Sequence, residues 1–127
     1  MMSTRLWQNT SKVHCNTEAR PDGNRLVYGG HIISMARALS FNGLANAQLI
    51  AAINAGAHTA PAFAGDTVYA WSEVLDKAET SAPGVGALRL RLVATKGRDE
   101  SMTLRGENNK YAPGVLLDLD LWALAPL

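Results

Sequence analysis

The feature of this sequence that most constrains its fold is an alternation of apolar and polar residues in the second half. In residues 87–94, leucines alternate with Arg89 and Arg91. Residues 115–123 repeat the pattern, and residues 67–75 combine β-branched with aromatic side chains. Successive side chains of a strand point to opposite faces of a sheet. We therefore expect antiparallel strands with one apolar face and one solvent-exposed face.

Residues 31–41 have a different pattern, which predicts one helix. Their polar members, Ser34, Arg37 and Ser40, recur at every third position and form a narrow stripe on an otherwise apolar surface. A helix with so narrow a polar face is mostly buried in its protein. The Asn-Gly pair at 42–43 is a typical helix C-terminal signal, so we expect the helix to end there.

The remaining segments are assigned by composition and by the residues that flank them. Residues 47–57 are rich in alanine, and we interpret them as a strand because Gly43 precedes them and Pro61 follows. Residues 101–113 are polar and predict a loop or a short irregular strand. Residues 1–24 are polar and turn-rich, and they end in a Pro-Asp-Gly turn signal.

Length and composition exclude several classes of protein. The 127 residues, 47% of them hydrophobic, suit one domain spanning 1–127. Twelve Lys and Arg against eleven Asp and Glu leave a net charge of +1, so we expect no nucleic-acid partner. The single cysteine, Cys15, cannot form an internal disulfide. We expect no leader peptide, no membrane partner and a cytoplasmic location, because the chain has no suitable apolar stretch.

One buried helix and about four strands, each apolar on one face only, suggest how the chain packs. A curled antiparallel sheet around the helix hides both apolar surfaces from water, which predicts an α+β fold. A sheet this small leaves its edge strands unpaired. We therefore expect a homodimer or a larger homo-oligomer.

Four stretches carry a resemblance to a known family, and together they cover most of the chain. They are residues 25–34, with a Gly-Gly pair; residues 40–46; residues 60–68, with Gly-Asp-Thr-Val; and residues 118–124. The chain resembles the MaoC-like (R)-specific enoyl-CoA hydratases and dehydratases, which have the hotdog fold. Within that family it is most similar to the C-terminal half of the mesaconyl-CoA hydratase (β-methylmalyl-CoA dehydratase) group.

The resemblance implies a catalytic site on residues 9–14. The family signature is an Asp followed five residues later by an acid/base His, and His14 occupies the histidine position. Asn9 stands where the family has Asp, and an amide cannot accept a proton at working pH. Two interpretations follow: Asn9 positions the water for His14, or another chain supplies the carboxylate.

The Gly29-Gly30 pair is the candidate for polarising the thioester carbonyl. Glycines at a helix start allow a close approach to free backbone N–H groups, and the resemblance places the carbonyl at Gly30. The alternative is a tight turn that packs on a strand. Gly29 and His31 are the candidate substrate-binding residues, although His31 also suits a packing role. The resemblance implies an acyl-CoA substrate, with coenzyme A only as part of that substrate and no separate cofactor.

The other polar residues suggest structural roles. His58 is interpreted as structural, and the three scattered histidines do not predict a metal site. A Cys15–His14 dyad is not expected if both residues lie on an extended strand, and we expect the thiol to be buried or half-exposed. Asp118 and Asp120 either pair as a carboxylate site or lie on the outer face of the sheet. The arginines between the leucines of 87–94 either contact coenzyme A phosphates or are solvated.

Two functions compete with the hydratase. Residues 27–31 also resemble the glycine-containing helix start of acyl-CoA thioesterases, many of which carry a carboxylate on the central helix. No Asp or Glu occurs between Gly23 and Gly65, which argues against that version. The third possibility is a non-catalytic acyl-CoA-binding half, because the mesaconyl-CoA hydratase group has two hotdog domains where this sequence has length for one.

Overall fold

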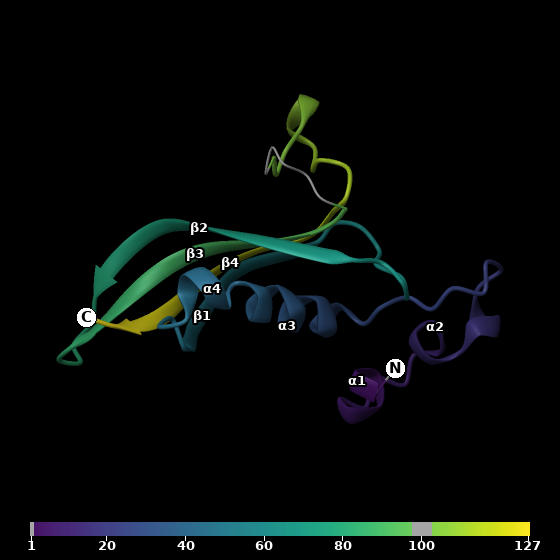
Figure 1. Ribbon diagram of the computed structural model, residues 1–127, viewed down its shortest axis with the longest axis horizontal. Coiled ribbons are helices and arrows are strands. Elements are labelled where there is room, and N and C mark those ends of the chain that lie inside the picture. Colours follow the sequence, from purple (N-terminus) through teal and green to yellow (C-terminus); the bar gives the residue numbers. More distant parts are fainter. Residues whose placement is uncertain (1, 98–102) are drawn as a thin grey trace.

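The computed structural model describes residues 2–97 and 103–127, and it places one helix against a single four-stranded sheet (Figure 1). The helices are α1 (Met2–Leu6), α2 (Lys12–Cys15), the 3-10 turn η1 (Thr17–Ala19), α3 (Gly29–Leu39), α4 (Phe41–Leu44) and the 3-10 turn η2 (Glu107–Asn109). The strands are β1 (Leu49–His58), β2 (Val68–Glu79), β3 (Val85–Lys96) and β4 (Val115–Pro126). The expected α+β hotdog architecture is confirmed.

The sheet is antiparallel throughout, with the spatial order β1-β4-β3-β2. The alternating segments form its three longest strands, and the alanine-rich segment forms β1 as expected. Leu90 of β3 lies opposite Leu121 of β4, and Leu92 lies opposite Leu119. This register places the leucines of both strands in the core, while the charged residues between them point to the other face.

The helix expected at 31–41 is displaced toward the N-terminus. α3 starts at Gly29 and ends at Leu39, and the Asn-Gly pair at 42–43 lies inside the next helical turn, α4. Gly43 does not adopt the left-handed conformation that caps a helix, so the chain continues right-handed after Ser40.

The sheet covers α3 along one side only (Figure 1). Ile32 and Ala36 are buried against the leucines of β3 and β4, whereas Ser34, Ala38 and Leu39 are exposed. The expectation of a mostly buried helix is therefore met on the sheet side alone. One curled sheet of this size cannot enclose a helix, and the apolar far side of α3 remains open.

The N-terminal segment folds into short helices, where the sequence suggested only polar turns. Cys15 lies on α2 and is exposed, so both the extended strand expected at this position and the half-buried thiol are wrong. The turn at residues 20–24 is confirmed, since Gly23 has a φ of 67°. Of the loop expected at 101–113, residues 101–102 lie outside the described residues, and the remainder is irregular around η2. No helix in the described part of the chain is long and apolar enough to cross a membrane.

Candidate active site

A cavity of about 380 Å³ lies where α2, the first turn of α3, the end of β1 and the start of β4 meet. Its polar side chains are those of His14, His58 and Thr59. Its remaining lining includes Gly29 and the apolar side chains of Ile32 and Leu116. We call this space the histidine cavity, because its only titratable side chains are imidazoles.

Two hydrogen bonds to one residue hold His14 at this cavity. The Leu26 N–H donates to the Val13 carbonyl over 3.0 Å, and the Leu26 carbonyl lies 2.8 Å from His14 Nδ1. A carbonyl oxygen only accepts hydrogen bonds, so Nδ1 carries the proton and the neutral ring keeps a lone pair on Nε2. The ring of Tyr28 meets the imidazole edge-on, with centroids 6.1 Å apart. His14 is thus oriented to accept a proton through Nε2.

The two glycines at the start of α3 each leave room for a ring. A Cβ atom at Gly29 would lie 2.8 Å from His58 Nε2, and one at Gly30 would lie 2.6 Å from the Tyr28 ring. Both contacts are shorter than real Cβ atoms make. Gly29 lines the histidine cavity, while the Tyr28 ring lies over Gly30. The Gly-Gly pair therefore allows the His58 and Tyr28 rings to pack closely against the start of α3.

Asn9 lies just before α2, and its side chain participates in the local turn. Its Oδ1 accepts the Ser11 N–H over 3.3 Å, and its own N–H donates to the Thr4 carbonyl. Asn9 does not line the histidine cavity, so the structure does not bring it together with His14 there. Its role as a water-positioning residue stays a prediction.

His31 lines a second cavity, of about 390 Å³, on the other side of the wall formed by Val27, Ile32 and Ala62. This second cavity is mainly apolar and also contains Met35 and the Tyr28 ring. The structure therefore separates His31 from His14, although both candidate residues lie next to the first turn of α3.

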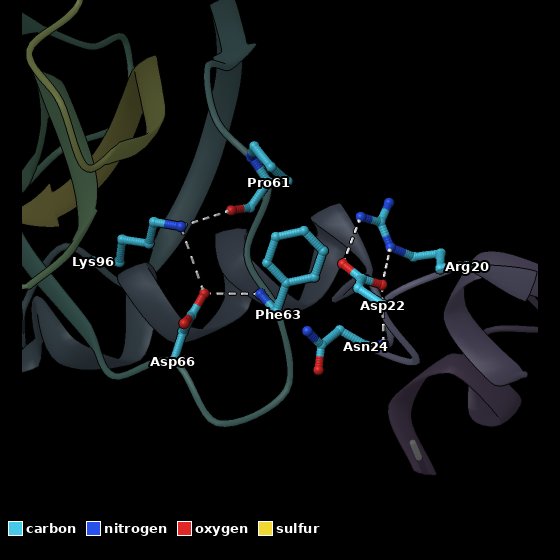
Figure 2. A network of polar contacts seen from close by, with 7 residues as sticks. All are labelled: Arg20, Asp22, Asn24, Pro61, Phe63, Asp66 and Lys96. Atoms are coloured by element: carbon cyan, nitrogen blue, oxygen red, sulfur yellow. Dashed lines mark hydrogen bonds and ion pairs between the residues drawn. The ribbon is translucent and has the colours of Figure 1, made fainter. Parts of the chain in front are cut away.

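The loop between β1 and β2 closes both cavities, and a network of polar contacts holds it (Figure 2). Asp66 Oδ2 accepts the Phe63 N–H over 2.9 Å and lies 3.9 Å from Lys96 Nζ. The Phe63 ring has Arg20 at 4.9 Å and Lys96 at 5.8 Å from its centroid, within cation–π range. Arg20 also hydrogen-bonds Asp22, which lowers the pKa of that carboxyl.

The charged residues of β3 and β4 form ion pairs on the sheet face away from α3. Arg89 Nη2 lies 2.7 Å from Asp120 Oδ2, and Arg91 Nε lies 3.3 Å from Asp118 Oδ1. The hydrogen bonds from Arg89, despite partial desolvation, lower the pKa of Asp120 to about 2. The aspartates lie on the outer face rather than at the histidine cavity. An aspartate therefore balances the positive charge of each of these two arginines.

His58 is the residue whose place beside His14 the sequence did not indicate. It is the last residue of β1, 44 positions after His14, and no spacing rule joins it to α2. The sequence feature related to its position is Gly29, because the His58 ring occupies the space where a Gly29 side chain would lie. Among the described residues, no group of three His, Cys, Asp or Glu side chains could hold a metal ion.

Comparison with known proteins tests the resemblance to MaoC-like hydratases and dehydratases. No model of a protein family matches the chain. A solved structure described as a MaoC-domain dehydratase, from Chloroflexus aurantiacus, superposes with a TM-score of 0.94 at 54% identity, over 99% of this chain and 37% of that one. The monoamine oxidase regulatory protein of Archaeoglobus fulgius shares the fold, with a TM-score of 0.74 at 18% identity over 98% of this chain and 78% of that one. The expected resemblance to MaoC-like hydratases and dehydratases is therefore confirmed.

Two curated relatives make the resemblance more specific. Mesaconyl-CoA hydratase of Cereibacter sphaeroides is 71% identical over 126 residues, which are 99% of this chain and 37% of that protein. Beta-methylmalyl-CoA dehydratase of Chloroflexus aurantiacus is 55% identical over 133 aligned residues, with the same two shares. The chain thus spans little more than a third of the length of the curated relatives it matches.

Proposed function

We propose that this chain is a hydratase/dehydratase domain that adds water to, or removes it from, the double bond of an enoyl-CoA thioester. The observation that carries the proposal is His14, held in one tautomer at a cavity beside the start of α3. The 71% identity to mesaconyl-CoA hydratase supports a branched, mesaconyl-CoA-like substrate. Coenzyme A would enter only as part of that substrate.

The chemistry assigns a role to each candidate group. In the hydration direction, His14 Nε2 takes a proton from water while the water oxygen bonds to the β-carbon. Negative charge then develops on the thioester oxygen, and the Gly30 N–H is the proposed donor to it. Asn9 is the proposed water-positioning residue, which requires a movement of the segment before α2. Gly29 is proposed to contact the acyl group in the histidine cavity, and His31 a part of the substrate that reaches the second cavity.

We further propose that a second hotdog, a copy of this chain, pairs along β1. β1 is an edge strand, and Leu49, Ile50 and Ile53 on it are 65%, 44% and 59% exposed. A long apolar edge strand of this kind favours pairing with another strand. Leu39, on the side of α3 away from the sheet, is also 48% exposed.

A single assay of the purified protein distinguishes the three functions. Mesaconyl-CoA is supplied, and both the enoyl-thioester absorbance and free thiol are followed. Loss of absorbance without thiol release is the result expected of a hydratase. Thiol release would instead indicate a thioesterase, and substrate binding without either change would indicate a non-catalytic half.

A further inference from the structure

We infer that His58 is the second proton-transfer group of this site and acts opposite His14 across the histidine cavity. The inference rests on the proposed hydratase activity. It concerns the proton that must reach the α-carbon, for which the sequence-derived candidates provide no donor other than His14 itself.

The geometry places His58 at the same cavity as His14 but on a different wall. His14 belongs to α2, whereas His58 ends β1, where it pairs with Leu117 of β4. The His58 ring lies against the first residue of α3, with Nε2 2.8 Å from where a Gly29 Cβ would be. The side chain is exposed, so a substrate can reach it from solvent. A bound acyl group in this space would have one imidazole on each wall.

The reaction needs two proton-transfer roles, and His14 can fill only one at a time. Syn hydration removes one proton from water and delivers one to the α-carbon of the same molecule. His14 accepts the first, because its Nδ1 is already bonded to the Leu26 carbonyl and its Nε2 is free. The amide of Asn9 cannot carry a proton between states. His58 is the other group in the cavity lining that can.

The proposed step balances without any added reagent. Neutral His14 takes a proton from water, the oxygen bonds to the β-carbon, and the π electrons move onto the thioester as an enolate. The His58 imidazolium then gives its proton to the α-carbon. This leaves His14 protonated and His58 neutral, and exchange with solvent restores both. The net change is the addition of one water molecule, and dehydration runs the same steps in reverse.

Few other charged or titratable groups line the cavity beside His58. The cavity walls come from α2, α3, β1 with the loop after it, and β4, and no Asp, Glu, Lys or Arg of the described residues lines them. His14 is the other titratable lining group. Tyr28, which touches the His14 ring edge-on, is the titratable residue that precedes Gly29.

The test compares pH profiles of kcat/KM for the wild type, His14→Gln and His58→Gln. A reaction that needs both a base and an acid is expected to give a wild-type rate that falls at low and at high pH. His58→Gln is expected to lower kcat by on the order of 10²–10⁴-fold and to abolish the fall at high pH. His14→Gln is expected to abolish the fall at low pH. Lys77→Gln, at an exposed position on β2, is the matched control and should keep both limbs.

Chemical rescue separates proton transfer from a merely structural role. His58→Gly leaves an opening at an exposed position, and added imidazole is expected to restore turnover in proportion to its concentration. Absence of rescue in a folded variant would overturn the inference, as would a His58→Gln effect confined to KM with both pH limbs retained. Wild-type protein that does not hydrate the substrate at all would contradict the proposed function itself. Unfolding curves for each variant verify that it is folded.

Discussion

At the scale of single residues, two glycines determine how closely the side chains of the site approach α3. Neither Gly29 nor Gly30 has a positive φ, so backbone freedom is not the reason for glycine here. The reason is space, since the His58 ring occupies the place of one Cβ and the Tyr28 ring that of the other. A methyl group at either position must displace a ring.

Gly29→Ala is expected to lower turnover while changing stability little. The added methyl displaces the His58 ring, which is exposed and free to rotate outward. Alanine also restricts the unfolded chain more than glycine does, which gains about 0.4–1 kcal/mol and offsets the cost of the contact. Turnover and urea unfolding are measured for Gly29→Ala, His58→Gln and the double variant.

The double-mutant cycle contains its own control. If Gly29→Ala acts by displacing His58, it has no further effect on turnover once His58 is Gln. Equal losses in both backgrounds would show that Gly29 acts on the site by another route.

The residue scale is also where sequence reasoning was least complete. His14 was found because the family signature includes a histidine, and the structure places it in the lining of a cavity. His58 was interpreted as structural, because the sequence does not reveal its contact with Gly29 between the end of β1 and the start of α3. Contacts between elements far apart in the sequence produce no periodicity or residue spacing from which they could be predicted.

At the scale of elements, the alternating segments were predicted correctly because a strand half-buried in a sheet has a strict period of two. The ends of α3 were displaced, because the Gly-Gly pair and the Asn-Gly pair are each compatible with either a helix or its boundary. Cys15 was misplaced for a related reason, since a helix of four residues such as α2 is too short to show periodicity. Packing, which local sequence does not encode, decided these boundaries.

The hydrogen bonds to Asp120 on the outer face of the sheet predict that acid lowers the stability of the folded protein. Asp120 of β4 accepts hydrogen bonds from Arg89 of β3 and Asn54 of β1 and so ties three strands together. Its pKa is about 2 in the folded protein against an ordinary 3.8. Between these values the unfolded chain binds a proton that the folded protein does not, so falling pH favours unfolding.

Asp120→Asn removes this contribution. The unfolding free energy of the wild type, measured by urea titration, is expected to decrease as the pH falls from 3.8 to about 2. The decrease is expected to be smaller in the variant, because an amide does not titrate. Identical pH dependence in the two proteins would show that the Arg89–Asp120 pair does not stabilise the folded state.

At the scale of the whole molecule, apolar surface remains uncovered among the described residues. It includes the free edge of β1 and the side of α3 away from the sheet. The matched relatives are more than twice as long as this chain. Both facts agree with a functional unit that contains more than one hotdog.

Ile53→Lys is expected to convert the proposed dimer to monomers. A charge on the exposed edge strand opposes strand pairing, as it does in natural edge strands. Light scattering after size-exclusion chromatography gives the mass of each variant. Val74→Lys, on the edge strand β2 at the opposite side of the sheet and similarly exposed, is the matched control. If Val74→Lys dissociates the dimer and Ile53→Lys does not, the interface lies along β2, and the proposed pairing along β1 is wrong.

The central claim is that His14 performs hydration of an enoyl-CoA thioester in this chain. Its most direct test is the steady-state rate of mesaconyl-CoA hydration by the wild type, by His14→Gln and by the Lys77→Gln control. We expect the His14 variant to remain folded and to lose on the order of 10²–10⁴-fold in kcat, while the control keeps the wild-type rate. A folded His14→Gln protein that hydrates mesaconyl-CoA as fast as the wild type would contradict the claim.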